Sequence, residues 1–257
     1  MDIIAKISEE LGIKRHQTEA AVKLIDEGNT IPFIARYRKE ATGALNDEVL
    51  RNLSERLTYL RGLEERKETV LASIEEQGKL TDELKAQILS AETMVLEDLY
   101  RPYKPKRRTR ATIAKEKGLE PLAGVITLQM IKTPLIEEAA KYVDAEKGVT
   151  TAEEAIAGAS DIIAESISDE ADYRTHIRDL TVKKGRMTST AKDPETESVY
   201  EMYYDFDEPV AKLAGHRILA VNRGEKEKFL TVKIEAPQED ILRYLEKKMI
   251  VRDNPQT

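Results

Sequence analysis

Apolar side chains recur at helical spacing along most of this chain. Ile3, Ile4, Ile7 and Leu11 form one stripe, and the stripe ends at Gly12. This spacing places the apolar residues on one face of a helix. Glycine commonly follows a helix end because it tolerates a positive φ. We therefore expect the chain to open with a short amphipathic helix.

A second helix is predicted over residues 14–27, with Ala21, Val22 and Ile25 facing the core and Gly28 at its end. Two short helices joined by a tight turn are typical of a helix-turn-helix, but any hairpin of two helices has the same pattern. The hairpin is the simpler interpretation, so the start of the chain is only helix-turn-helix-like.

A long helix is predicted after a short third one. Pro32 suits the first turn of the third helix, and Asn46 offers an N-cap for a helix that reaches Gln77. The long helix has apolar residues at heptad spacing, interrupted by Glu64 and Lys67. Those apolar residues are Leu50, Leu53, Leu57, Leu60, Leu71 and Ile74. With only two uninterrupted heptads, packing within the molecule is favoured over a dimeric coiled coil.

Helical patterns continue to residue 184, and the pattern then changes. Shorter helices are predicted over residues 82–90, 93–100, 110–117, 121–131, 134–146, 151–168 and 169–184. Residues 186–198 are polar and contain Pro194, as expected of a linker. Alternation over residues 229–234 predicts one strand, and Pro237 opens a last helix. The predicted fold class is all-α, a multi-helical scaffold followed by a small segment with a single strand.

Charge is distributed unevenly along the chain. The 257 residues include 41 Lys and Arg against 48 Asp and Glu, a formal net charge of −7. Residues 101–117 hold eight basic residues and one acidic residue, which leaves 33 basic and 47 acidic residues, a net −14, elsewhere. Residues 152–172 and 193–208 each hold seven acidic residues and neither Lys nor Arg. Such asymmetry reports on partners and surfaces, so the acidic average does not exclude nucleic acid.

Several classes of active site lack the residues that they need. The absence of Cys excludes disulfides, thiolate catalysis and Cys-ligated zinc. No two of the twelve glycines lie closer than six residues apart, so the chain has neither a dinucleotide-binding loop nor a Walker A loop. The three histidines lack the spacing of a metal pair. We therefore expect that the chain is not an enzyme and that it has no catalytic residue, no metal site and no cofactor.

The composition also bears on where the protein acts. No apolar run approaches the roughly 18 residues of a membrane span, and the first residues lack the features of an export signal. Charged residues make up 35% of the chain with both signs interspersed, which is typical of a folded, well-solvated helical protein. We expect a cytoplasmic protein without a membrane partner.

The strongest candidate site is the basic stripe, defined here as residues 101–117. Pro102 and Pro105 keep its first half extended. Closely spaced cations on an extended backbone can follow successive phosphates, and Tyr100 or Tyr103 could stack on a base. The candidate phosphate contacts are Lys104, Lys106, Arg107, Arg108 and Arg110.

The same stripe has an internal alternative. Its cations could pair with the acidic residues of 152–172 or 193–208 inside the molecule, with both tyrosines in the core. Composition favours neither interpretation, and each can hold for different residues.

Two smaller groups are weaker candidates. Arg36, Arg38 and Lys39 lie on the predicted third helix, either as a solvated face or as secondary phosphate contacts. The apolar side of that helix, with Phe33, Ile34 and Tyr37, is expected to pack inward. Tyr200, Tyr203, Tyr204 and Phe206 lie among acidic residues that would repel phosphate, so they predict a core or a docking face.

Three separated segments carry a resemblance to a known family. They are IPFIARYRKEATG at residues 31–43, LEDLYRPYKPKRRTRATIAKEKGLEPLA at residues 96–123 and HRILAVNRGEKE at residues 216–227. In these segments, and over essentially its whole length, the chain resembles the Tex family of bacterial transcription accessory proteins. Ala44 departs from the resemblance, because a second glycine is expected after Gly43.

The resemblance implies a helical N-terminal domain at residues 1–190 and a connector at residues 191–257. Members of the family continue into an RNase-H-like domain, helix-hairpin-helix modules and an OB-fold that binds RNA, so we expect this chain to be the N-terminal part. The resemblance implies a monomeric protein that binds RNA or DNA in transcription regulation or RNA metabolism. It also implies that the protein is not an enzyme.

A second function belongs to a different class. The chain could be a protein-interaction module that docks RNA polymerase or other transcription factors without touching nucleic acid. Its candidate surfaces are the acidic residues 152–172 and the aromatic residues 200–206.

Overall fold

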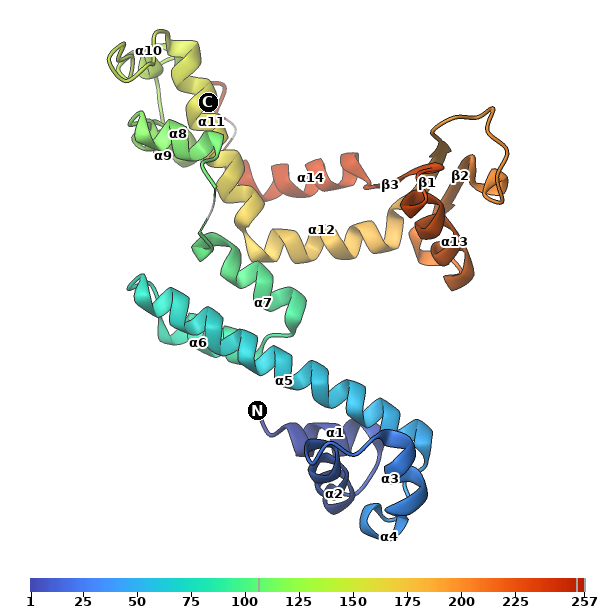
Figure 1. Cartoon of the computed structure of the whole chain (residues 1–257). Helices are drawn as coiled ribbons and strands as arrows, with labels where there is room; N and C mark the ends of the chain where they lie inside the picture. Colours follow the sequence, from blue (N-terminus) through green and yellow to red (C-terminus); the bar gives the residue numbers. More distant parts are fainter. Residues whose placement is uncertain (106, 253, 257) are drawn as a thin grey trace. The chain divides into compact units, whose positions relative to one another are not determined.

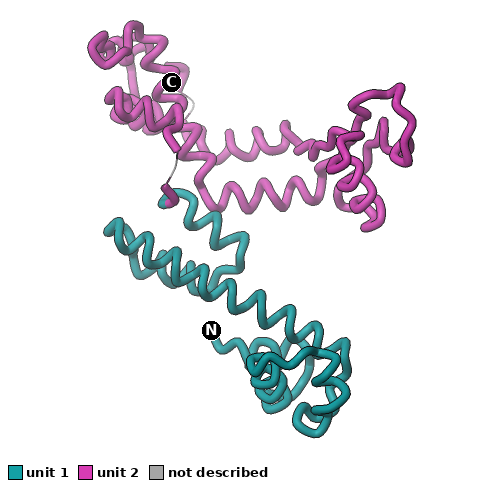
Figure 2. Tube along the Cα trace, in the orientation of Figure 1, with its two compact units in different colours: residues 1–103 teal, residues 104–257 magenta. Residues whose placement is uncertain are grey.

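Helices make up most of the protein, as the sequence predicts. The structure is a computed structural model, and it describes residues 1–105, 107–252 and 254–256. Fourteen α-helices and three β-strands occur in these residues (Figure 1). They divide into two units, unit 1 from Met1 to Tyr103 and unit 2 from Lys104 to Thr257 (Figure 2).

Unit 1 is entirely helical. Its elements are α1 (Ile3–Leu11), α2 (Arg15–Asp26), α3 (Ile31–Tyr37), α4 (Lys39–Thr42), α5 (Asp47–Glu76), α6 (Asp82–Ser90), α7 (Thr93–Tyr100) and the 3₁₀ turn η1 (Arg101–Tyr103). The side chain of Asn46 caps α5 by accepting a hydrogen bond from the backbone N–H of Val49 at 2.8 Å. The predicted boundaries therefore hold to within about two residues for most of these helices.

The leucine stripe of α5 builds two cores within unit 1. The first joins the N-terminal half of α5 to α1, α2 and α3 through Ile7, Ala21, Ile34, Leu50, Leu53, Leu57 and Leu60. The second joins the C-terminal half to α6 and α7 through Leu63, Val70, Ile74, Ile88, Leu96 and Tyr100. Each fully buried leucine contributes about 1.5–3 kcal/mol. The stripe is thus covered by helices of the same chain, as its broken heptads predict.

One lysine lies within that stripe and is nonetheless buried. Lys67 exposes 3% of its surface. Its Nζ donates to the backbone carbonyl of Leu89 at 2.7 Å and lies 3.2 Å from Oε1 of Glu64. A buried ammonium is tolerated only when a counter-charge and hydrogen-bond acceptors surround it. The interruption of the heptads is therefore an internal tether between α5 and the end of α6.

Helix α4 ends in two consecutive left-handed residues. Gly43 has a φ of 63°, and Ala44 has a φ of 61°. A Cβ at Gly43 would lie 2.6 Å from Nε2 of Gln17, so only glycine fits there without a shift. Ala44 has its Cβ in a region that costs an L-residue roughly 1–2 kcal/mol. The residue that departs from the Tex pattern thus occupies a position where glycine is favoured.

Unit 2 contains helices and a small sheet. Its elements are α8 (Arg110–Glu116), α9 (Glu120–Leu128), α10 (Leu135–Ala140), α11 (Ala152–Asp169), α12 (Ala171–Lys184), β1 (Arg186–Ala191), η2 (Glu201–Tyr203), β2 (Asp205–Pro209), η3 (Val210–Lys212), α13 (Gly215–Lys226), β3 (Leu230–Glu235) and α14 (Gln238–Met249). Helix α10 ends earlier than predicted because Asp144 accepts from the backbone N–H of Glu146 and of Lys147, which turns the chain back at Gly148.

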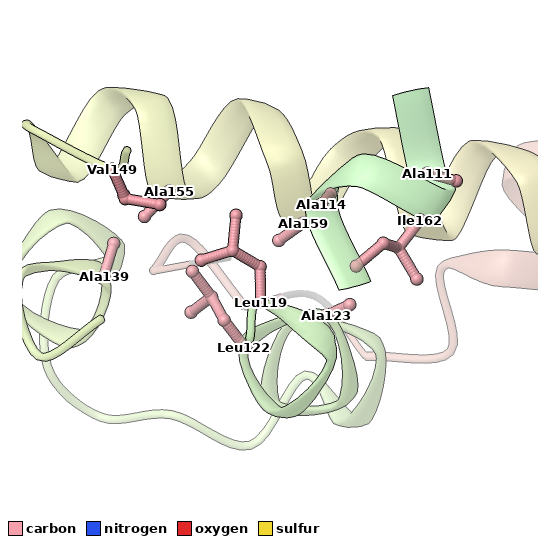
Figure 3. Close-up of a cluster of buried hydrophobic side chains, with 10 residues drawn as sticks. All are labelled: Ala111, Ala114, Leu119, Leu122, Ala123, Ala139, Val149, Ala155, Ala159 and Ile162. Atoms are coloured by element: carbon pink, nitrogen blue, oxygen red, sulfur yellow. The ribbon is translucent and has the colours of Figure 1, made fainter. Parts of the chain in front are cut away.

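Small residues let α11 pack closely on α8 and α9. Figure 3 shows Ala155, Ala159 and Ile162 of α11 facing the side chains of α8 and α9. Gly158 lies on the same helix, and a Cβ there would be 2.4 Å from Cδ1 of Leu119 and 3.3 Å from Cβ of Ala114. The absence of a side chain at this position therefore sets the approach of the helices.

The prediction of a single strand is wrong. Strand β3 forms as expected, but β1 lies between β2 and β3 in a three-stranded antiparallel sheet, within the segment predicted as a linker. Only Met187 and Ser189 of β1 are buried, and the Ser189 hydroxyl donates to the carbonyl of Tyr203 at 2.6 Å. Backbone pairing on both sides holds β1, so its side chains carry little apolar pattern.

The predicted domain boundary near residue 190 lies at the end of β1. That position is inside unit 2, whereas contacts divide the chain between Tyr103 and Lys104. The division into domains at residues 1–190 and 191–257 stays a prediction.

We predict that Ala44→Gly stabilises unit 1. Removing the Cβ relieves left-handed strain and should raise the free energy of unfolding by about 1 kcal/mol. Equilibrium urea unfolding measures the change. Ala41→Gly is the matched control, because Ala41 is also exposed but lies in α4, where glycine should lower stability by roughly 0.5–1 kcal/mol. Equal losses in both variants would contradict the strain at residue 44.

We predict the opposite sign for Gly158→Ala. The gain in helix propensity, about 1 kcal/mol, is smaller than the cost of forcing Leu119 and Ala114 apart, roughly 1–3 kcal/mol. The net effect should be a loss of stability in urea unfolding. Gly124 of α9 is the control, because a Cβ there meets nothing within 4 Å, so Gly124→Ala should stabilise the same unit.

Candidate nucleic-acid interface

Buried side chains and hydrogen bonds from α2 hold the segment from α3 to α4 in place. Ile34 and Thr42 are fully buried, and the Thr42 hydroxyl donates to the carbonyl of Arg38 at 3.2 Å. Nε2 of Gln17, from α2, donates to the carbonyls of Thr42 at 3.2 Å and Gly43 at 3.1 Å. These contacts fix the backbone on which the exposed residues of the segment stand.

The cations of this segment have no carboxylate partner. Arg36, Arg38 and Lys39 are all exposed. Unit 1 is described in full, and no carboxylate within it lies within 4.0 Å of these three side chains. The guanidinium of Arg38 instead lies over the ring of Phe33, 5.0 Å from its centroid. Their positive charge is therefore available to a phosphate.

Other arginines of unit 1 are neutralised locally. Five of them, Arg15, Arg51, Arg56, Arg61 and Arg66, pair with carboxylates at 2.6–2.7 Å. Hydrogen bonds from Arg61 hold the pKa of Asp26 below its ordinary value, and Arg56 does the same to the pKa of Glu10. In an acidic protein, pairing is thus the usual state of an arginine, and Arg36 and Arg38 differ from it.

Tyr37 lies beside these cations and is 65% exposed. The expectation that it packs inward is wrong, because α3 ends at Tyr37 and Ile34 alone is fully buried on that helix. Phe33 is half-buried, and the rings of Phe33 and Tyr37 have centroids 5.3 Å apart. The structure thus brings an exposed aromatic ring together with three cations.

Carboxylates neutralise two of the four candidate cations of the basic stripe that the structure describes. Lys104, Arg107, Arg108 and Arg110 are exposed, and Lys106 lies outside the described residues. Arg108 pairs with Glu116 at 2.6 Å, and Arg110 lies 3.6 Å from Asp161 of α11. Among the described residues, Lys104 and Arg107 have no ion-pair partner. Internal pairing with the acidic residues of 152–172 therefore holds for Arg110 and not for Lys104 or Arg107.

The tyrosines of the stripe are structural. Tyr100 is buried in the second core, its hydroxyl lies 3.0 Å from Oγ of Ser73, and the Arg66 guanidinium lies over its ring. Tyr103 is half-buried against the same core, and its carbonyl accepts from Nε2 of Gln77 at 2.9 Å. Neither ring is open to a base, so the candidate stacking residue is Tyr37 instead.

The aromatic residues 200–206 are mainly internal. Tyr200 is buried, and its hydroxyl donates to Glu227 at 2.8 Å. Burial and this acceptor raise the pKa of Tyr200. Tyr203 and Phe206 pack edge to face at 5.4 Å. The exposed apolar side chains of this region are Val199 and Met202, at 86% and 83%.

The described residues contain neither a candidate metal site nor a candidate membrane span. No group of three or more His, Asp or Glu side chains placed to hold a metal ion occurs among them. None of their helices is long and apolar enough to cross a bilayer.

The chain is similar to proteins of one family over nearly its whole length. A model of the Tex-like protein N-terminal domain matches residues 1–75, and a Tex central region-like model matches residues 132–254. Arg36, Arg38 and Lys39 lie in the first match, and Lys104 to Arg110 lie between the two matches.

Individual relatives cover the gap between the two matches. The Uncharacterized protein YdcI of Bacillus subtilis is 49% identical over 95% of this chain and 35% of its own length. The Transcriptional accessory protein Tex of Neisseria gonorrhoeae is 46% identical over 93% of this chain and 32% of its own. The human S1 RNA-binding domain-containing protein 1 is 29% identical over 91% of this chain and 24% of its own length.

The chain spans between a quarter and about a third of the length of these relatives. It belongs to the Tex family, and it corresponds to the N-terminal and central regions of that family.

Proposed function

We propose that this chain is a nucleic-acid-binding scaffold of a transcription accessory protein, without catalytic activity of its own. One observation carries the proposal: five exposed cations, Arg36, Arg38, Lys39, Lys104 and Arg107, lack a carboxylate partner among the described residues of an acidic protein. Phosphates are the ligands that exposed, unpaired cations attract. The names of two relatives, a transcriptional accessory protein and an S1 RNA-binding domain-containing protein, agree with it.

The residues divide into direct and recruited contacts. The five unpaired cations contact phosphates without breaking any internal interaction. Arg108 and Arg110 are recruited from exposed ion pairs, which cost only about 0–1 kcal/mol each to open. Lys106 belongs to the same stripe by sequence. Because a phosphate contact carries no base information, the scaffold binds RNA or DNA with little sequence preference.

A second function is favoured by a separate observation. Val199 and Met202 are almost fully exposed within the acidic residues 193–208. Exposed apolar side chains rimmed by charge are typical of protein-interaction surfaces. The alternative is therefore a module that docks RNA polymerase or another transcription factor through this segment. Failure of the chain to bind any oligonucleotide at low salt would favour it.

We predict a steep salt dependence of nucleic-acid binding. The five unpaired cations alone, without the recruited arginines, give a slope near −4 in a plot of log K against log salt concentration. Lys104→Gln with Arg107→Gln removes two contacts and should reduce the slope to about −2. Fluorescence anisotropy of a labelled oligonucleotide across a salt series measures both.

The control for that experiment is Arg223→Gln. Arg223 is also exposed and in unit 2, but it lies outside the basic stripe and pairs with Glu227 at 2.8 Å, so its loss should leave the slope unchanged. Circular dichroism checks that every variant is folded. An unchanged slope in the folded double variant would rule out Lys104 and Arg107 as phosphate contacts.

We predict that freeing Arg110 strengthens binding. Asp161→Asn removes its ion-pair partner and should raise the affinity for an oligonucleotide by up to about fivefold, the value of an exposed pair. Glu153→Gln removes the same charge from an exposed position of α11 and serves as the matched control. Equal gains from both variants would mean that only net charge matters and that Arg110 makes no contact.

A further inference from the structure

We propose that the exposed ring of Tyr37 stacks on an unpaired base, so that the α3–α4 segment selects single-stranded nucleic acid over a duplex. This inference rests on the proposed function and narrows its ligand to one class. Four observations carry it. The ring is exposed, it packs against Phe33, its hydroxyl has no hydrogen-bond partner within unit 1, and unpaired cations flank it in the chain.

The hydroxyl of Tyr37 has no hydrogen-bond partner within unit 1, and the contact of its ring with Phe33 leaves the side chain 65% exposed. Tyr59 of the same unit gives the contrast, because its hydroxyl accepts from the Thr93 hydroxyl at 2.9 Å and the Arg56 guanidinium lies over its ring at 4.7 Å. Within unit 1, which is described in full, Tyr37 has neither a hydroxyl partner nor a cation over its ring. An exposed aromatic ring without a hydrogen-bond or cation partner offers a surface that a ligand can cover at little cost in free energy.

The ring is also held in place. Its contact with Phe33, at 5.3 Å between centroids and 46° between planes, comes from residues four apart on one helix face. Arg38 lies over the same Phe33 ring at 5.0 Å, and its Nη1 donates to the carbonyl of Tyr37 at 3.2 Å. Phe33 thus supports Tyr37 and Arg38 together. A preorganised ring loses less entropy when it stacks on a ligand.

Charge around the ring suits a nucleic-acid backbone. Arg36, Arg38 and Lys39 flank Tyr37 in the chain and have no carboxylate partner within unit 1. The segment lies at the carboxyl end of α3, where the helix dipole places about half a negative charge. Three full positive charges outweigh it. Phosphates bind through these side chains, therefore, and not through helix amides.

The combination of an exposed ring and flanking cations favours the binding of single-stranded nucleic acid over a duplex. In a duplex both faces of each base are covered by neighbouring bases, whereas a single strand can turn a base onto an aromatic side chain. Such stacking tolerates any base, because every base has a π face. The α3–α4 segment thus takes single-stranded RNA or DNA, with one base on Tyr37 and adjacent phosphates on the cations.

The experiment compares Tyr37→Ala and Tyr37→Phe with the unaltered chain. Anisotropy measures binding to a single-stranded RNA, to a DNA of the same sequence and to the corresponding duplex. Tyr37→Ala should weaken binding to single strands about five- to hundredfold, the usual value of one stacked base, and leave duplex binding unchanged. Tyr37→Phe keeps the ring and should keep the affinity. The RNA and DNA arms show which strand is preferred.

A direct readout of stacking comes from Tyr37→Trp. The chain has no Trp, so the new indole is the only one, and its fluorescence should be quenched when a single strand binds. Met202→Trp is the matched control, because Met202 is exposed among acidic residues, and its fluorescence should not change.

Two results would overturn the proposal in distinguishable ways. If the chain binds oligonucleotides with the expected salt slope but Tyr37→Ala binds single strands normally, the stacking site is wrong and the proposed function stands. If the unaltered chain binds no oligonucleotide at low salt, both are wrong, and Tyr37 becomes a candidate for a protein contact. Circular dichroism and urea unfolding confirm that each variant is folded.

Discussion

The contact between the leucine stripe of α5 and the first three helices is the one on which unit 1 depends. Leu50, Leu53 and Leu57 belong to one buried cluster with Ile34 of α3, which is fully buried. That burial holds a helix of only seven residues, which would not be stable alone in water. Because Ile34 is fixed, the residues after it are presented outward at the end of α3. The position of the candidate site follows from a core to which none of its cations contributes.

Charge pairing supplies the second constraint on the site. With 48 acidic residues available, an exposed arginine usually has a carboxylate nearby, and five arginines of unit 1 follow this rule. Exposed pairs add little stability, so leaving a cation unpaired costs little as well. What pairing changes is the local potential. The unpaired cations of the α3–α4 segment, together with Lys104 and Arg107, keep a positive local potential that the paired arginines lose.

The sequence predicted the helices better than it predicted exposure. The boundaries of α2, α5, α6, α7 and α11 follow from caps and helical spacing, because both act within a few residues of chain. Tyr37 was assigned to the apolar side of α3 by the same spacing. Its exposure depends on how the chain packs after α3, where Gln17 donates to the carbonyls of Thr42 and Gly43 from 25 and 26 residues away, and no local pattern contains such contacts.

Strand β1 and the tyrosines at the start of the basic stripe depend on contacts that are distant in sequence. β1 is stabilised by backbone hydrogen bonds to two partners distant in sequence, and half of its six side chains are Thr or Ser. Tyr100 precedes the cations in the sequence but faces the core formed by α5, α6 and α7. Sequence neighbours share a composition without sharing an environment. Pairing and burial therefore decide which residues of a basic stripe can meet a ligand.

An acidic protein can bind nucleic acid through so few cations because the two kinds of charge act over different distances. At physiological salt, interactions between exposed charges are screened beyond about 8 Å. The net charge of −7 therefore slows the approach of a polyanion chiefly at low salt. Direct contacts between cations and phosphates, once formed, slow dissociation instead. The stacking proposed for Tyr37 would add a contribution that salt does not screen. A site of this composition thus loses its electrostatic affinity as salt rises while it retains the part that depends on an unpaired base.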